Sequence, residues 1–187
     1  GIYADVEPHP TSLVLTATTP DGKRVGPYEI PMRPDVLLAE AQQGSFWSYI
    51  AGVAYHVVAH YPVQGLVIDN YQTDLPIKKG LSSSAAICVL AARAFNRLYD
   101  LKLTIRDEME LAYQGEITTP SRCGRMDQGC AFGGRPVLMT FDGDQLDTAE
   151  LHAGRGRPDR ARVAVGGVLV GDVPAHPQAV ARGARCR

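Results

Sequence analysis

Apolar residues recur with the period of an α-helix along much of the chain. From Phe46 they stand at offsets of three, four, seven, eight, eleven and twelve residues, which predicts a helix to about residue 58 with Ser45 as its N-cap. A second helix is predicted over 83–99. It is apolar almost all round and should be buried, with Arg93 and Arg97 on the solvent side of its last turns.

A third helix is predicted to begin at a capping box. Thr104 with Asp107 three positions later forms this signature, with Asp in place of the usual Glu. We expect the helix to direct Met109, Ala112 and Tyr113 toward the core. Thr118-Thr119-Pro120 should end it.

Short β-branched stretches predict the strands. Segments 2–7, 12–19 and 25–30 are separated by proline- or glycine-containing turns and are expected to form a β-meander. Segment 65–68 reads as a buried strand followed by a polar loop over 71–79, and segment 136–141 reads as a strand closed by the turn 142–144. This order of strands and helices predicts an α+β domain.

Composition places the chain among ordinary globular proteins. Its 187 residues are 45% hydrophobic and 21% charged, without an apolar run long enough to span a bilayer. The first residues show no secretory signal, and the four cysteines show no zinc or redox spacing. We therefore expect reduced thiols, a cytoplasmic location and no membrane partner.

A phosphate-binding loop is predicted before the second helix. The run Pro76-Ile77-Lys78-Lys79-Gly80-Leu81-Ser82-Ser83-Ser84-Ala85-Ala86 lies between a strand and a helix N-terminus, where unpaired N–H groups and the helix dipole favour anions. Gly80 lets the backbone approach a phosphate, and the lysines and serines add charge and hydroxyls. The alternative is a serine-rich cap with two solvated lysines. The loop is neither a Walker loop nor a nucleophile elbow.

A second glycine-rich loop carries a candidate catalytic acid. In Cys123-Gly124-Arg125-Met126-Asp127-Gln128, Asp127 could orient an acceptor hydroxyl or take its proton during phosphoryl transfer. An isolated Asp in such a turn is more often only a turn residue.

Both loops resemble motifs of the GHMP kinases, the superfamily of galactokinase, homoserine kinase and mevalonate kinase. The first resembles Pro-x-x-x-Gly-Leu-Gly/Ser-Ser-Ser-Ala, with Lys78 where many members have glycine. The second resembles the galactokinase-like Cys-Gly-x-Met-Asp-Gln, with Arg125 in place of an aliphatic residue.

This resemblance implies roles for individual residues. The nucleotide phosphates of ATP would be bound by Pro76, Lys78, Lys79, Gly80, Leu81, Ser82, Ser83, Ser84 and Ala85. Ser84 and Glu116 would hold Mg²⁺, although Glu116 lies one residue closer to Cys123 than in galactokinase. Asp127 would be catalytic, and Cys123, Gly124 and Asp127 would contact the sugar.

The chain divides near residue 153. Residues 1–153 are expected to form the GHMP kinase N-terminal domain, with the family's first motif expected before Gly1 and the C-terminal domain absent. Segment 154–187 is rich in Arg, Gly and Ala. We considered a basic nucleic-acid-binding arm, a disordered linker and a shifted reading frame, and favour the last.

The sequence thus predicts an ATP- and Mg²⁺-dependent kinase acting on a sugar hydroxyl, incomplete as given. The alternative is a non-catalytic domain of the same fold that binds a sugar or nucleotide. Nucleic acid is an unfavoured partner because the chain before residue 154 is acidic overall. His56 and His60, four residues apart, are expected to pack at the edge of their helix rather than bind a metal.

Overall fold

The computed structural model describes residues 1–75, 82–133, 137–142 and 145–150. The strands are β1 (Ile2–His9), β2 (Ser12–Thr18), β3 (Arg24–Pro31), β4 (Gly65–Thr73), β5 (Val137–Asp142) and β6 (Gln145–Glu150). The helices are α1 (Pro34–Gln42), α2 (Ser48–His60), α3 (Ser83–Tyr99), α4 (Ile105–Thr118) and the 3₁₀-helix η1 (Asp127–Phe132). The α+β class is confirmed, while Pro136, the turn residues 143–144 and the segment 154–187 lie outside the described residues.

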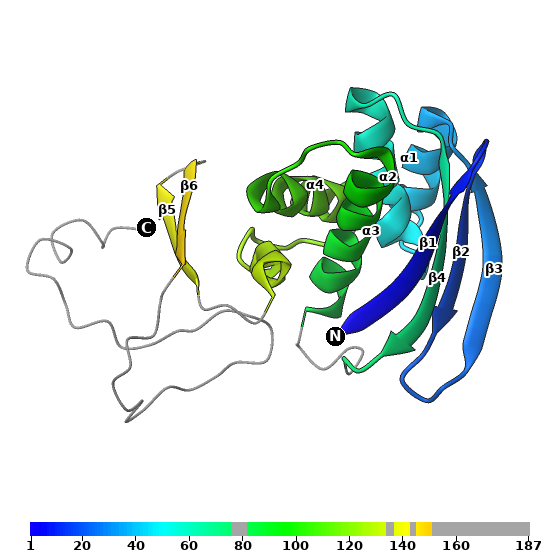
Figure 1. Cartoon of the computed structure of the whole chain (residues 1–187), viewed down its shortest axis with the longest axis horizontal. Helices are drawn as coiled ribbons and strands as arrows, with labels where there is room; N and C mark the ends of the chain where they lie inside the picture. Colours follow the sequence, from blue (N-terminus) through cyan, green and yellow to red (C-terminus); the bar gives the residue numbers. More distant parts are fainter. Residues whose placement is uncertain (76–81, 134–136, 143–144, 151–187) are drawn as a thin grey trace, which may run out of the picture.

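A four-stranded sheet in the order β1-β4-β2-β3 forms one layer of the fold, and the helices cover one face of it (Figure 1). The predicted meander is wrong at its first connection, because β4 lies between β1 and β2 and pairs with β2 in parallel. Strand β4 also continues to Thr73, through part of the predicted polar loop. Strand β4 thereby takes a central position, where both of its edges are paired.

Alternation along the two central strands directs one face of the sheet to the core. Leu13 pairs with Leu66 and Leu15 with Ile68 in register, and all four side chains are buried. Residues between them point to the opposite face, as the two-residue period of a strand requires. The helices pack on the leucine and isoleucine side.

Buried Asn70 closes the end of β4 that leads toward α3. Its Nδ2 donates to the carbonyls of Tyr3 and Gln72 at 2.8 and 2.9 Å, and its Oδ1 accepts from Thr18 N and Thr73 Oγ1 at 3.2 and 3.0 Å. One amide therefore satisfies groups from β1, β2 and β4 at once.

Helix starts agree with the sequence in two of three cases. Helix α3 spans Ser83–Tyr99 as predicted, and α4 begins with the Thr104–Asp107 capping box. Helix α2 begins at Ser48 instead of next to Ser45. The Ser45 hydroxyl accepts from Trp47 N at 3.2 Å, just before the helix, and donates to the carboxylate of buried Glu40 at 2.7 Å, so it joins the start of α2 to α1.

Two side chains point elsewhere than the helical pattern predicts. Arg93 does not face solvent: it is half-buried and pairs with buried Glu108 at 2.8 Å. Tyr113 lies outside the core, with the Arg125 guanidinium 4.8 Å above its ring. Arg97 is exposed, as predicted.

Helices α2 and α4 touch backbone to backbone. A Cβ added to Gly52 would lie 2.2 Å from the Gly115 carbonyl oxygen, and one added to Gly115 would lie 2.4 Å from Val53 Cγ2. Such distances exclude any side chain at either position without separation of the helices. The contact fixes the last turn of α4, where Glu116 follows Gly115.

Candidate active site

The catalytic-loop residues gather where η1 meets α3 and α4. Asp127 is the first residue of η1 and is half-buried, Cys123 is half-buried in the preceding loop, and Gly124 is exposed. Helix η1 packs against both α3 and α4. The loop is therefore held by the two helices whose ends carry the other predicted site residues.

Glu116 is a buried carboxylate at the end of α4, with 2% of its surface exposed. Its Oε2 accepts a hydrogen bond of 2.8 Å from Gln128 Nε2. In the part of the chain that the structure describes, no Lys, Arg or His side chain forms an ion pair with it. A buried carboxylate without a counter-charge is costly, so this position suits a cation.

Besides burial, Glu116 contributes to the raised pKa values of three cysteine thiols, those of Cys88, Cys123 and Cys130. Burial raises the pKa of Cys88 well above its usual value, and Glu116, Cys123 and Cys130 add to the rise. Burial, followed by the charge of Glu116, raises the pKa of Cys123 to about 11. Both cysteines are therefore neutral thiols at physiological pH.

Asp127 lies close to the same cluster. Its charge contributes to the raised pKa values of Cys123 and Cys130, both about 11, for which burial is the main cause. Glu116 contributes to both as well. The two carboxylates predicted for catalysis and for the metal thus act on the same thiols from η1 and from α4.

The N-terminus of α3 supplies the remaining described site residues. Ser84 stands four residues before Cys88, hence on the same helix face and one turn nearer the N-terminus. The N-cap Ser82 has φ of 50° and its side chain makes no capping hydrogen bond. Ordinary N-caps are extended and bond to the first-turn N–H groups. The start of α3 is thus left without the side-chain cap that would compete with a ligand.

Part of the predicted phosphate loop lies outside the described residues. These positions are Pro76, Lys78, Lys79, Gly80 and Leu81. Ser82, Ser83 and Ser84 are half-buried at the start of α3, and Ala85 is fully buried. The structure brings Glu116, Cys123 and Asp127 together and places Ser84 on the helix face directed to them.

Gln128 is a site residue that the sequence reasoning did not assign. Its side chain is fully buried, and besides Glu116 its Nε2 faces Cys123 Sγ at 3.9 Å. Its Oε1 is buried with no hydrogen-bond partner among the described residues. Its place directly after Asp127 in the Cys-Gly-x-Met-Asp-Gln pattern was the available signal.

The histidine pair is occupied by local contacts. His56 Nε2 lies 2.8 Å from Thr118 Oγ1, and His60 Nδ1 lies 2.8 Å from the His56 carbonyl. Among residues whose placement the structure gives, no cluster of three or more His, Cys, Asp or Glu side chains could hold a metal. Mg²⁺ does not need one, because it is commonly held by one or two protein oxygens together with phosphates and water.

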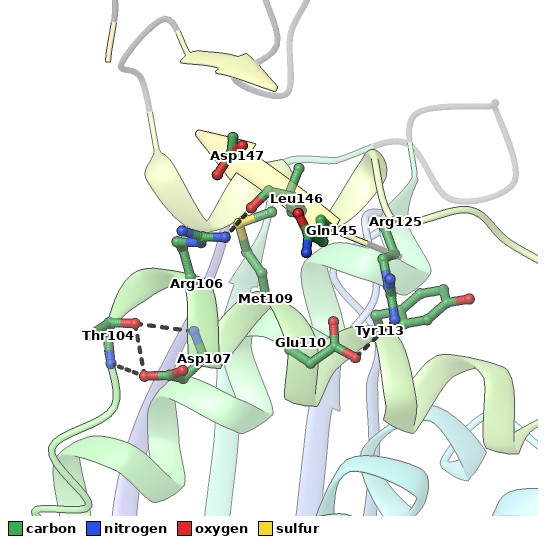
Figure 2. A pocket seen from close by; sticks show the side chains of 10 residues that line it. All are labelled: Thr104, Arg106, Asp107, Met109, Glu110, Tyr113, Arg125, Gln145, Leu146 and Asp147. Atoms are coloured by element: carbon green, nitrogen blue, oxygen red, sulfur yellow. Dashed lines mark hydrogen bonds and ion pairs between the residues drawn. The ribbon is translucent and has the colours of Figure 1, made fainter. Parts of the chain in front are cut away.

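A cavity of about 640 Å³ lies beside α4 and β6 (Figure 2). Figure 2 shows that its charged side chains engage nearby groups: Arg106 bonds the Leu146 carbonyl, Asp107 bonds Thr104, and Glu110 pairs with Arg125 at 3.3 Å. Asp127 and Glu116 do not line it. Arg125, which replaces an aliphatic residue of the motif, thus belongs to this cavity.

Comparison with known proteins gives one family match and a similar relative. Residues 48–134 match the family model described as GHMP kinases N terminal domain. The chain is similar to a protein named galactokinase from Thermosipho africanus (strain TCF52B), with 31% identity over 124 residues. That match covers 64% of this chain but 35% of the relative, so the chain spans about a third of the length of the curated relative it matches.

Proposed function

The chain belongs to the GHMP kinases through the N-terminal domain that it contains, and on that premise we propose that it transfers the γ-phosphoryl group of ATP to a sugar hydroxyl. The similarity to a galactokinase supports a sugar as the acceptor. The Cys123–Gln128 motif supports the same class of acceptor.

Asp127 is the proposed catalytic residue. Its carboxylate would orient the acceptor hydroxyl and take its proton as the hydroxyl oxygen bonds to the γ-phosphorus and the bond from that phosphorus to the ADP oxygen breaks. Cys123 and Gly124 are proposed to contact the sugar. Because Cys123 is a neutral thiol, it would act there as a weak hydrogen-bonding group rather than a nucleophile.

We assign the nucleotide phosphates to the start of α3, and the metal to one residue of α3 and one of α4. Ser82, Ser83, Ser84 and Ala85 at the start of α3 would bind phosphate oxygens, together with the loop residues 76 and 78–81. Ser84 and Glu116 would hold Mg²⁺, for which a hydroxyl and a buried carboxylate are suitable ligands. Bound Mg²⁺ would neutralise phosphate charge as it develops during transfer.

One observation carries the proposal: Gln128, which directly follows Asp127 in η1, donates a hydrogen bond of 2.8 Å to buried Glu116 in the last turn of α4, so the two elements that carry the acids are in contact. A metal-holding acid and an acid for the acceptor must lie near one another in a phosphoryl-transfer site.

The test is phosphorylation by the purified chain of a panel of sugars with Mg-ATP, followed by ³¹P NMR. We expect one or a few sugars to be converted, and an Asp127→Asn variant to lose about 10²–10⁴-fold in rate. The matched control is Asp100→Asn. Asp100 is exposed, pairs with Lys102 and has φ of 50°, a conformation that asparagine tolerates.

The outcomes separate the two functions considered. If Asp127→Asn keeps the full rate, Asp127 is not the catalytic residue. If no sugar is phosphorylated while a sugar or a nucleotide still binds by calorimetry, the chain is a non-catalytic binding domain of the kinase fold.

We also propose that residues 1–153 form the kinase domain, apart from segment 154–187, and that the protein is cytoplasmic. Cys88, Cys123 and Cys130 are free, which suits a reducing compartment. None of the described helices combines the length and apolar character required to cross a membrane. Limited proteolysis with mass spectrometry tests the boundary, and cell fractionation tests the location.

A further inference from the structure

Gln128 joins the two acids of the proposed site. It follows Asp127 directly in η1, and its side chain crosses to the last turn of α4, where Nε2 donates to Glu116 Oε2 at 2.8 Å. Both members of this hydrogen bond are almost completely buried. The bond is therefore screened from water, unlike an amide–carboxylate contact at the surface.

The orientation of this amide is set by Glu116. A carboxylate accepts hydrogen bonds, so the Gln128 NH₂ group must face it, and Oε1 must point the other way. That oxygen remains buried without a partner among the described residues. An apolar side chain could fill the same space without burying an unpaired polar atom. We therefore take the hydrogen bond to Glu116 as the reason for an amide at this position.

We propose that Gln128 is a positioning residue that holds the Glu116 carboxylate in one orientation for a divalent cation. This inference rests on the proposed function, since it takes Glu116 as a cation ligand. By binding Oε2, the amide restricts rotation of the carboxylate. Because Gln128 and Asp127 share one short helix, the same turn also ties the position of the cation ligand to that of the catalytic acid.

The test measures cation binding rather than turnover. Mn²⁺, which is paramagnetic and replaces Mg²⁺ at oxygen sites, is titrated into the purified 187-residue chain with a non-hydrolysable ATP analogue and followed by electron paramagnetic resonance. Gln128→Met keeps the length of the side chain and removes the donor. We expect Mn²⁺ affinity to fall about 10- to 100-fold, the usual effect of removing a partner that orients a metal ligand.

The chain offers a matched control on α4. Gln114 Nε2 donates to Glu110 Oε1 at 2.7 Å, the same chemical contact in an exposed position. Gln114→Met should leave Mn²⁺ affinity unchanged. A fall of similar size in this control would mean that the loss comes from general damage to α4 and would overturn the proposal.

A double-mutant cycle separates positioning from packing. In a Glu116→Gln background there is no carboxylate left to orient, so adding Gln128→Met should change Mn²⁺ affinity less than twofold. If Gln128→Met is poorly folded by circular dichroism, Gln128→Asn replaces it, because a side chain one methylene shorter keeps the amide but cannot span the present distance.

The possible failures differ. If Glu116→Gln weakens Mn²⁺ binding but neither Gln128 variant does, Gln128 is not a positioning residue and the proposed function stands. If Glu116→Gln has no effect, Glu116 is not a cation ligand, and the metal assignment of the proposed function falls together with this inference.

Discussion

Helix α4 has a buried glutamate near each end, and the two glutamates differ in their hydrogen-bonding and ion-pair partners. Glu108 in the first turn is 5% exposed, and Glu116 in the last turn is 2% exposed. Glu108 accepts from Arg93 Nε at 2.9 Å and from Asn96 Nδ2 at 2.8 Å. Glu116 has the neutral amide of Gln128 and no protein cation among the described residues.

This difference separates a carboxylate held in an ion pair from the one proposed as a metal ligand. An arginine at Glu108 neutralises the buried charge and ties α4 to α3 and, through the 2.7 Å bond from Arg93 to the Ala131 carbonyl, to η1. At Glu116 the charge is oriented but not neutralised. This contrast is the reason that Glu116, rather than Glu108, is proposed as the cation ligand.

The largest effect is expected when the ion pair between Arg93 and Glu108 is removed. Arg93→Met keeps much of the aliphatic stem but leaves Glu108 buried and unpaired, which should lower the free energy of unfolding by about 3–5 kcal/mol. Urea denaturation followed by circular dichroism measures it. Arg33→Met is the control, because the pair of Arg33 with Asp35 is exposed and should contribute at most about 1 kcal/mol. Equal losses in both variants would contradict the contrast.

The next largest effect is expected at Glu116, where substitution should raise the free energy of unfolding instead of lowering it. Glu116→Gln removes a buried charge that has no ion-pair partner among the residues whose placement the structure gives, so it should raise the free energy of unfolding by about 1–2 kcal/mol. The same variant should lose most of the stabilisation given by Mg-ATP, which is about 2.7 kcal/mol at a hundredfold excess over Kd. Loss of stability as large as that of Arg93→Met would mean that both ends are structural.

The smallest expected effect is a dependence of the free energy of unfolding on pH, caused by the thiol of Cys130. Burial raises the pKa of Cys130 from 9.0 to about 11, while nearby Arg93 lowers it and Asp127 and Glu116 raise it. The folded state therefore keeps a proton that the unfolded state loses, so stability is present below pH 9 and falls as pH rises toward 11. We expect about 1 kcal/mol to be lost between pH 8 and 10 on this account.

Urea denaturation of a Cys130→Ala variant at several pH values isolates this contribution, because titration of other groups is common to both proteins. The variant should lose less stability than the parent chain over the same range. Parallel pH profiles would show that Cys130 does not titrate differently in the folded and unfolded states.

Local signals in the sequence predicted much of the helical layer. The limits of α3 and the capping box of α4 follow from neighbouring residues, and the structure confirms both. Helix α1 was missed, although Pro34 in its first turn followed by Asp35 is a recognised start signal. The insertion of β4 between β1 and β2 could not be predicted, since strand order depends on contacts far apart in the chain.

In the candidate site, too, residues within local motifs could be predicted from the sequence, whereas contacts between distant residues could not. Asp127 and Glu116 were identified from motifs, and the structure brings them near one another, although their roles stay predictions. The partner of Arg93 is fifteen residues away on another helix, and a periodic pattern cannot reveal such a pairing. Gln128 was overlooked because a glutamine in a loop is usually solvated, and only its complete burial marks it.

The crossing of Gly52 and Gly115 limits how this site can change. Because the backbones meet where Gly52 faces Gly115, a side chain at either position would force α2 and α4 apart. The position of Glu116, which follows Gly115, is therefore tied to this contact. A change in the shape of the proposed site is expected to come instead from the segment between α4 and η1, whose Gly124 has open space around it.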